Sequence, residues 1–251
     1  MINAILHGSS GRMGQTIISL LAEDQNIKII AGIDAFNNGK NDFPVYQSIK
    51  ECDLRADVII DFSIASAIDN LLDYCGDKLI PCVICTTGLS DNQLAHLHDT
   101  AEKVAILKSA NMSLGINLLL KMLKEATNIL TPAGFDIEIV EKHHNQKVDA
   151  PSGTALALGD SINETLDKEY TYVFDRSQTR EKRTKKEIGY SAIRGGTIVG
   201  EHDVIFAGTD EVVTFSHTAY SRSVFAKGAI EAAKFLTGKP ARLYTMADVI
   251  G

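Results

Sequence analysis

The densest group of residues that could do chemistry lies between positions 141 and 154. Two adjacent histidines, His143 and His144, and Lys147 supply proton donors that work near neutral pH. A zinc site is one alternative, but adjacent histidines on an extended chain point in opposite directions, and no companion Cys/His set is obvious. The other alternative is a polar loop without a ligand. The residue types favour a site that delivers a proton.

A helix start follows this cluster. Ser152 is a good N-cap residue, and Gly153 and Thr154 would then lie in the first turn of a helix. Backbone N–H groups at such a position, together with the Thr154 hydroxyl, can hold an anion. The combination predicts a site for a carboxylate-bearing substrate that must receive a proton.

Three glycines near the N-terminus, Gly8, Gly11 and Gly14, have the spacing G-x-x-G-x-x-G. They lie between an expected strand and an expected helix, where glycines let the backbone approach a pyrophosphate at a helix N-terminus. Asp34 follows the next expected strand, at the position where an acid binds the adenosine ribose hydroxyls. The alternative is a tight strand-to-helix turn without a ligand. The context predicts a dinucleotide site.

Asp34 also bears on which dinucleotide binds. Its carboxylate would repel a 2′-phosphate, and Ala35 beside it offers no cation, so NADH is slightly favoured. Arg12 in the glycine loop could reach a 2′-phosphate, which leaves NADPH open.

Two further loops follow expected strands on the same edge of the sheet, 86–88 and 109–113. Ligands bind at the carboxyl ends of strands in open α/β sheets, and small hydroxyl and amide side chains there suit a nicotinamide carboxamide. Simple helix capping by Thr86 or Ser113 is the alternative interpretation.

Other candidates are weaker. Cys82 and Cys85 form a C-x-x-C within an apolar strand-like run, which predicts buried structural thiols on opposite faces of the strand. His96 and His98 are expected on a helix surface. The basic stretch 176–187 is expected to be a solvated, mobile loop.

The first half of the chain alternates apolar strands with helices, which predicts a parallel sheet covered on both faces. The expected strands are 3–7, 28–33, 57–62, 81–85 and 104–107, and the expected helices are 11–22, 66–74 and 90–102. The fold class is therefore α/β, a Rossmann-like doubly wound sheet.

The second half has a different pattern, which predicts a strand-rich α+β unit. Its expected helices are 114–130 and one after Ser152, and its expected strands are 135–141, 187–194, 197–207 and 211–220 with a hairpin turn at 208–210. A last expected helix, 223–236, could return to pack on the first domain. We expect a dinucleotide-binding domain over 1–113 and 221–251 and a second domain over 114–220.

Composition limits the function classes. The chain has 251 residues and a net charge of −7, which argues against broad nucleic-acid binding. It has no apolar stretch of 18 residues and no basic leader, so we expect a cytoplasmic protein with no membrane partner.

These motifs together resemble the dihydrodipicolinate reductase family along nearly the whole chain. The most specific part is His143-His144, Lys147 and Asp149-Ala150-Pro151-Ser152-Gly153-Thr154. The other matching segments, in order, are Gly8 to Gly14, Asp61-Phe62-Ser63, Thr86-Thr87-Gly88, 109–113 and the run from Arg194-Gly195-Gly196 to Gly200-Glu201-His202.

The resemblance implies NADH- or NADPH-dependent reduction of a cyclic dicarboxylate to tetrahydrodipicolinate, in the diaminopimelate route to lysine, by a homotetramer. It implies that His143 and Lys147 donate the proton and that His144, Gly153 and Thr154 bind substrate. The cofactor residues that it implies are Gly8, Gly11, Arg12, Met13, Gly14, Asp34, Thr86, Thr87, Gly88, Ala110, Asn111, Met112, Arg222 and Phe225. No metal is implied.

Two alternatives remain at this point. One is another two-domain NAD(P)-dependent reductase, such as an aspartate dehydrogenase-like enzyme. The other is a nucleotide-sensing regulator, which would keep the glycine loop without needing the His-His-Lys set.

Overall fold

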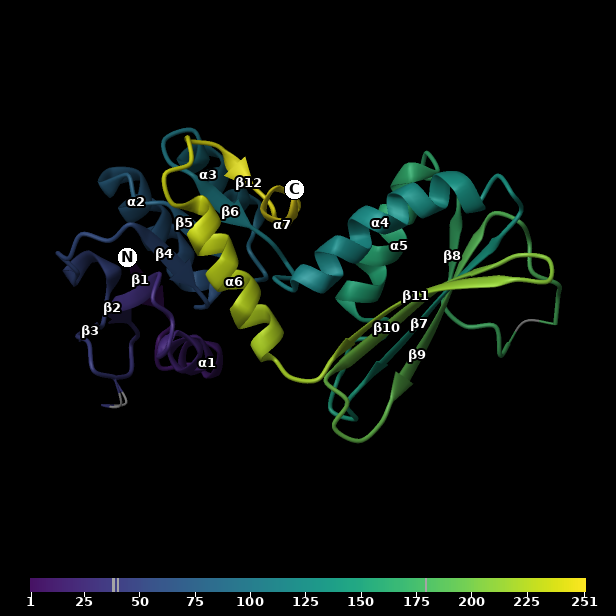
Figure 1. Cartoon of the computed structure of the whole chain (residues 1–251), viewed down its shortest axis with the longest axis horizontal. Coiled ribbons are helices and arrows are strands. Elements are labelled where there is room, and N and C mark those ends of the chain that lie inside the picture. Colours follow the sequence, from purple (N-terminus) through teal and green to yellow (C-terminus); the bar gives the residue numbers. More distant parts are fainter. Residues whose placement is uncertain (38, 40, 179) are drawn as a thin grey trace. The chain divides into compact units, whose positions relative to one another are not determined.

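The computed structural model describes residues 1–37, 39, 41–178 and 180–251 (Figure 1). The chain forms two compact units. Unit 1 contains Met1–Leu114 and Ser223–Gly251, and unit 2 contains Gly115–Arg222. Within the described residues, none of the helices combines the length and the apolar composition needed to cross a bilayer.

Unit 1 is built on a parallel sheet with the strand order β12-β6-β5-β4-β1-β2-β3 (Figure 1). Its strands are β1 (Ile2–His7), β2 (Ile27–Ile33), β3 (Val45–Tyr46), β4 (Val58–Asp61), β5 (Cys82–Ile84), β6 (Ile106–Lys108) and β12 (Leu243–Tyr244). Its helices are α1 (Arg12–Leu21), α2 (Ile68–Lys78), α3 (Asp91–Ala101), α6 (Ser223–Leu236) and α7 (Met246–Ile250), with short 3-10 turns at Ile49–Glu51 and Ala65–Ala67.

Helices cover both faces of this sheet. Alternate residues of β1 and β4, such as Leu6 and Ile60, pack with α1 and α6, while Ile5 and Ile59 pack with α2 and α3. Strands buried on both faces need apolar residues at every position, which explains their continuous apolar runs. The predicted doubly wound α/β fold is confirmed.

Unit 2 contains a five-stranded mixed sheet with the order β11-β10-β7-β9-β8. Its strands are β7 (Asp136–His143), β8 (Thr171–Val173), β9 (Glu187–Arg194), β10 (Gly200–Ala207) and β11 (Val212–Ala219), and its helices are α4 (Leu114–Leu130) and α5 (Gly153–Thr165). Both helices pack on one face of the sheet, where Leu123 and Leu158 meet Ile139 and Phe206.

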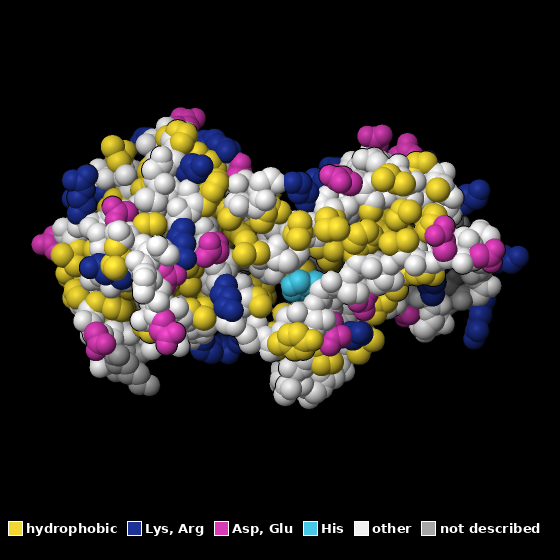
Figure 2. Space-filling model, viewed as in Figure 1, with side chains coloured by type: hydrophobic (Ala, Val, Ile, Leu, Met, Phe, Trp, Pro, Cys, Tyr) yellow, Lys and Arg dark blue, Asp and Glu magenta, His cyan; other side chains and the backbone are white. Residues whose placement is uncertain are grey.

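The helices leave part of unit 2 with apolar residues at the surface. Figure 2 shows hydrophobic side chains gathered over α4 and α5. The outer side of α4 exposes Leu118, Met122 and Ile129. Ile193 and Val212 are exposed on the strands.

The expected elements differ from the structure mainly where elements are short. The strands β3, β8 and β12 have two or three residues, too few to show an alternating pattern, and they were not expected. The expected strand from Thr197 begins only at Gly200, and α2 continues past Tyr74 to Lys78. The hairpin turn is confirmed, since the Gly208 N–H donates to the Glu211 carbonyl.

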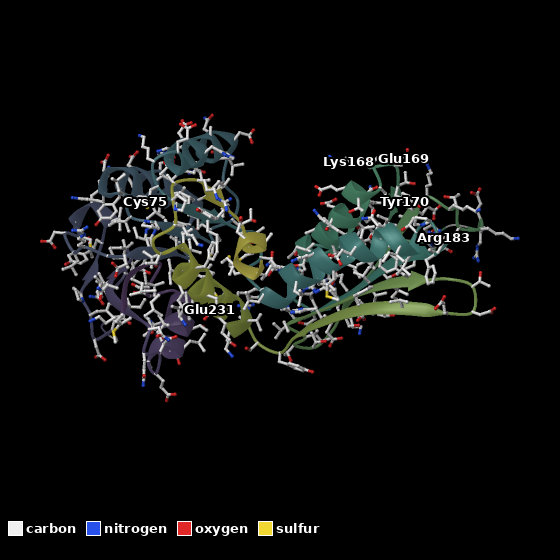
Figure 3. All side chains as sticks on the ribbon, turned by 45° about the horizontal axis from the view of Figure 1, so that its top comes forward. Cys75, Lys168, Glu169, Tyr170, Arg183 and Glu231 are labelled. Carbon is white, nitrogen blue, oxygen red and sulfur yellow. The ribbon has the colours of Figure 1, made fainter. Side chains whose placement is uncertain are left out.

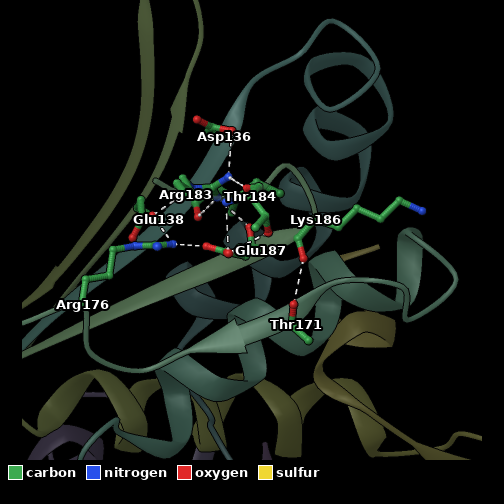
Figure 4. Close-up of polar contacts among 9 residues, drawn as sticks. Asp136, Glu138, Thr171, Arg176, Arg183, Thr184, Lys186 and Glu187 are labelled. Atoms are coloured by element: carbon green, nitrogen blue, oxygen red, sulfur yellow. Dashed lines mark hydrogen bonds and ion pairs between the residues drawn. The ribbon is translucent and has the colours of Figure 1, made fainter. Parts of the chain in front are cut away.

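The expectation of a solvated loop over 176–187 is wrong for two of its arginines (Figure 4). Arg183, labelled also in Figure 3, donates to Asp136 Oδ1 at 2.7 Å and to Glu138 Oε1 at 3.2 Å. Arg176 pairs with Glu187. The apolar positions of β7 face the helices, so its alternating acids face outward and attract the basic segment.

Candidate functional site

The glycine loop of unit 1 tolerates no side chain at two of its positions. Gly8 has a φ of +82°, and a Cβ there would lie 2.5 Å from the Phe62 carbonyl oxygen. A Cβ at Gly14 would overlap the Gly8 carbonyl oxygen. Helix α1 begins at Arg12, and its N-cap residue Gly11 has no side chain to occupy the first N–H groups. The loop therefore leaves a helix N-terminus open to an anion.

Asp34 lies directly against this loop. Its Oδ2 accepts a hydrogen bond from the Ser10 N–H at 2.9 Å, and its Oδ1 accepts one from the Phe36 N–H at 3.0 Å. The carboxylate is only half-buried. The structure thus brings Asp34 and the glycine loop together, as a dinucleotide site requires.

A buried carboxylate organises the next loops on this edge, and the sequence reasoning gave it no role. Asp61 is 0% exposed at the end of β4. Its Oδ1 lies 2.9 Å from His7 Nδ1, and its Oδ2 accepts a hydrogen bond from Thr86 Oγ1 at 2.7 Å. Burial alone would raise the pKa of Asp61, but these contacts and the Ser63 N–H lower it below its usual value. The signal was available, because these residues end the neighbouring strands β1, β4 and β5.

In the Thr86–Gly88 loop, one residue is held in the protein and two are exposed. The Thr86 side chain is buried on Asp61, while Thr87 and Gly88 are exposed, and Gly88 adopts a φ of +74°. Lys108 Nζ donates to the Thr86 carbonyl oxygen at 2.9 Å. The exposed residues of the loop are the ones open to a ligand.

The loop after β6 reaches the same edge of the sheet. Asn111 Oδ1 accepts a hydrogen bond from the Ser113 N–H at 2.9 Å, and Ala110 is exposed. Met112 is buried in the core, so its side chain serves packing.

Three other expected cofactor residues are scattered. Met13 is half-buried against the core of unit 1, as is Phe225. Arg222 is exposed and belongs to unit 2. The structure thus assigns Arg222 and Phe225 to different units.

The cysteines are free thiols. Cys82 packs in the core on one face of the unit 1 sheet, whereas Cys85 packs on the other. Burial raises the pKa of both thiols well above the usual value. Cys75 lies on α2 (Figure 3). The prediction that the two thiols lie on opposite faces is confirmed, while the predicted burial is complete for Cys82 and partial for Cys85.

In unit 2, the alternation of β7 determines the site. Ile137 and Ile139 face the helices, and the next two residues of that face are Glu141 and His143. The same row therefore ends in two polar residues that are buried with the core. His143 Nδ1 lies 2.6 Å from Glu141 Oε2. The alternation in the sequence predicted the strand 135–141, but it was not extended to Glu141 and His143 on the buried face.

Glu141 is 1% exposed and has further partners. Arg194, at the end of β9, donates from Nη1 to Oε2 at 2.8 Å and from Nη2 to Oε1 at 2.6 Å. The Ser152 N–H donates to Oε1 at 3.0 Å. Burial would raise the pKa of Glu141, but these contacts lower it, so the group is a carboxylate.

His202 closes the site from β10. Its ring meets that of His143 edge-on, with the centroids 5.1 Å apart, and its Nε2 lies 3.0 Å from Ser152 Oγ. Burial lowers the pKa of His202 to about 4. Burial also lowers the pKa of His143, although Glu141 opposes this effect. In the sequence, Arg194 and His202 belonged only to a segment that resembles the family, and no role was predicted for either side chain.

The remaining predicted residues lie around this core. Lys147 Nζ forms an ion pair with Asp149 Oδ1 at 2.8 Å, which lowers the pKa of Asp149. His144 is half-buried. Ser152 is the N-cap of α5, as predicted, and its Oγ accepts a hydrogen bond from the Ala155 N–H.

The start of α5 is open to solvent. Gly153 is exposed and a Cβ on it would meet open space. The first turn of α5 contains no acidic residue. Lys147 and the Gly153 N–H together lower the pKa of the Asp149 carboxyl, so this turn already stabilises one carboxylate. The structure brings this helix start and His143 together through Glu141.

Comparisons with known proteins match these two units. The family model described as "Dihydrodipicolinate reductase, N-terminus" matches residues 2–112, and that described as "Dihydrodipicolinate reductase, C-terminus" matches residues 115–250. A 4-hydroxy-tetrahydrodipicolinate reductase of Caldanaerobacter subterraneus is 52% identical over 100% of this chain and 98% of its own length. One of Clostridium novyi is 48% identical, with the same shares covered.

A solved structure shares the fold. A dipicolinate-bound dihydrodipicolinate reductase from Paenisporosarcina superposes with a TM-score of 0.82 and 24% identity, covering 98% of this chain and 97% of that one. The family models and the full-length relatives agree, and the chain belongs to the dihydrodipicolinate reductase family.

Proposed function

We propose that the chain catalyses the NAD(P)H-dependent reduction that names this family, giving tetrahydrodipicolinate in the diaminopimelate route to lysine. One observation carries the proposal: the Glu141 carboxylate contacts both His143 and Ser152, the N-cap residue of α5. A dicarboxylate that must accept a proton needs a donor and an anion site at a fixed separation. The full-length relatives bear the name of this reaction.

The glycine loop fits a dinucleotide. A pyrophosphate would bind the N–H groups at the start of α1, close to Gly8 and Gly14, where the backbone leaves no room for a Cβ. Asp34 would accept hydrogen bonds from the adenosine ribose, which favours NADH. Thr87, Gly88, Ala110 and Asn111 would line the nicotinamide side. When bound, the cofactor would supply the hydride.

The residues of unit 2 supply the proton. Hydride addition to a conjugated imine leaves an enamine-like anion, which must be protonated. His143, with Nδ1 directed at Glu141, has Nε2 left to donate, and Lys147 adds a cation. His144, Gly153 and Thr154 would hold a substrate carboxylate. These positive groups offset the repulsion of a dianion by a protein of net charge −7.

We also assign the protein to the cytoplasm as a homotetramer. Four free cysteines suit a reducing compartment. The apolar residues that unit 2 exposes, Ile193 and Val212 on the strands and the outer side of α4, support assembly through this unit. Light scattering of the purified protein measures the mass, and a monomer would contradict the assignment.

A coupled assay tests the activity. The substrate is generated from pyruvate and aspartate semialdehyde by the upstream synthase, and loss of reduced nicotinamide absorbance is followed with NADH and NADPH in parallel. We expect oxidation that depends on the synthase, and faster with NADH. A folded protein that binds NADH and oxidises neither cofactor would contradict the proposal.

A further inference from the structure

The Glu141 carboxylate contacts two elements of unit 2, the end of β7 and the start of α5. Its Oε2 lies 2.6 Å from His143 Nδ1, and its Oε1 accepts the N–H of Ser152, the N-cap residue of α5. The two oxygens of a buried carboxylate thus fix the end of β7 and the start of α5 relative to each other. We propose that Glu141 is the positioning residue of the site: it sets the tautomer of His143 and the separation between His143 and the anion-binding turn of α5. This inference rests on the proposed function.

The contact with His143 determines where its ring carries a proton. A carboxylate only accepts hydrogen bonds, so Nδ1 must carry the hydrogen. Nε2 is then the atom that gains and loses a proton. Gly200 lies beside it, since a Cβ there would be 3.1 Å from Nε2. Glycine at this position leaves room next to the reacting nitrogen.

The contact with Ser152 determines where the anion site lies. The Ser152 N–H is held by Glu141, and its Oγ is held by the Ala155 N–H and by His202 Nε2 at 3.0 Å. Ser152 therefore has little freedom, and Gly153 and Thr154 follow it directly. A substrate carboxylate bound there would lie at a fixed distance from His143.

Arg194 makes this arrangement compatible with proton donation. An isolated buried carboxylate would stabilise the imidazolium strongly and hold its proton. Arg194 neutralises Glu141 through two contacts, and its charge lowers the pKa of His143. Arg194 Nη2 also donates to the Asp149 carbonyl oxygen at 2.6 Å, which anchors the segment that carries Lys147.

The neighbouring strand offers a matched control. Glu201, on β10, pairs in register with Lys142 and forms an ion pair with its Nζ at 2.8 Å. Residues 142 and 201 point to the opposite face of the sheet from Glu141 and His143, and Glu201 is half-exposed. Glu201→Gln removes a carboxylate next to the site without touching it.

The test compares Glu141→Gln with Glu201→Gln in the full chain. Nitrogen NMR of protein labelled with ¹⁵N-histidine reports the tautomer and the titration of His143. In Glu141→Gln the amide oxygen can still accept the Nδ1–H hydrogen bond, but the negative charge is gone, so we expect a titration midpoint of His143 at least about one pH unit lower. We expect kcat to fall by at least about 100-fold, and we expect the descending limb of its pH profile to move to lower pH. Binding of NADH should stay unchanged, and Glu201→Gln should behave like the wild type.

A wild-type titration midpoint and pH profile in Glu141→Gln would overturn the inference, as would equal losses in both variants. Glu141→Gln leaves Arg194 without its charged partner and could fail to fold, so the double variant Glu141→Leu/Arg194→Met is made as well, and it also removes the acceptor of the Nδ1–H hydrogen bond. It should fold, keep the low kcat and lose the Nδ1–H tautomer, and a wild-type kcat or a wild-type tautomer in it would also overturn the inference. If the wild type itself does not reduce the synthase product, the proposed function fails, while the NMR result still decides whether Glu141 sets the tautomer.

Discussion

Each unit contains a carboxylate that is removed from solvent and held against a histidine, and the two are neutralised differently. Asp61 in unit 1 contacts His7, Thr86 and the Ser63 N–H, and no described Lys or Arg forms an ion pair with it. Glu141 in unit 2 contacts His143 and has Arg194 as a permanent cation.

The difference indicates what each histidine is for. His7 Nδ1 lies 2.9 Å from the buried Asp61 carboxylate, so it serves to hold Asp61 and, through it, the Thr86 loop. Glu141 already has a cation, so it can orient His143 without needing the imidazole to be charged. Unit 1 shows a structural pair, whereas unit 2 shows a pair suited to proton transfer.

Lys147→Ala gives the largest effect on chemistry. The residue lies in unit 2 and forms an ion pair with the exposed Asp149 side chain, so its loss should leave the fold intact. We expect kcat to fall by about 10²- to 10⁴-fold, the usual range for a general acid. Calorimetric titration should give an unchanged Kd for NADH. A matched loss of NADH binding would contradict the assignment of cofactor binding to unit 1 and proton donation to unit 2.

Arg194→Met should destabilise the protein more than His7→Gln. Removing Arg194 leaves Glu141 buried beside a histidine whose pKa is lowered, which costs about 3–5 kcal/mol. Glutamine in place of His7 can still donate to Asp61, and the expected loss is about 1–3 kcal/mol. Urea unfolding at pH 7 measures both. The reverse order would show that Asp61, not Glu141, depends on a charged partner.

The units should respond differently to mild acid. A histidine in the unfolded chain titrates near 6.5, and His202 in the folded chain at about 4. Between these values the unfolded state binds more protons, so the free energy of unfolding falls as the pH falls, by about 3 kcal/mol. Asp61, whose pKa is lowered from 3.8, contributes stability above that pH and loses it only below.

Hydrogen exchange, corrected for intrinsic rates, measures this difference at pH 7 and pH 5. Unit 2 should lose protection first, and His202→Gln, which can still bond Ser152, should reduce that loss. Equal loss in both units, unchanged by His202→Gln, would contradict the assignment.

Asp34→Ala should give the smallest effect. The carboxylate lies at the glycine loop, where it would bind the ribose hydroxyls of NADH. We expect Kd for NADH to rise about tenfold, which corresponds to one charged hydrogen bond, and Kd for NADPH to rise less. Equal effects on both cofactors would show that Asp34 does not contact the ribose.

Much of this arrangement was visible in the sequence. The apolar strands, the glycine spacing and the cap residue Ser152 act locally, and the structure bears out the elements they predict. The role of Glu141 was not recognised, because it depends on partners from β9, α5 and β7 that only the folded sheet brings together. Asp61 could have been found, because Asp61 and His7 end the neighbouring strands β4 and β1, which meet at one edge of the sheet. Arg183 in the basic stretch was misjudged because its partner acids lie about 45 residues away along the chain, whereas the partner of Arg176, Glu187, lies within the stretch itself.

The most direct test is a crossed binding experiment on Asp61→Asn and Glu141→Gln, with NADH and a pyridine dicarboxylate as the two probes. If the two buried carboxylates organise separate halves of the reaction, Asp61→Asn weakens NADH and leaves the dicarboxylate unchanged. Glu141→Gln does the opposite. Loss of both ligands in either variant, in protein that remains folded, would contradict the account.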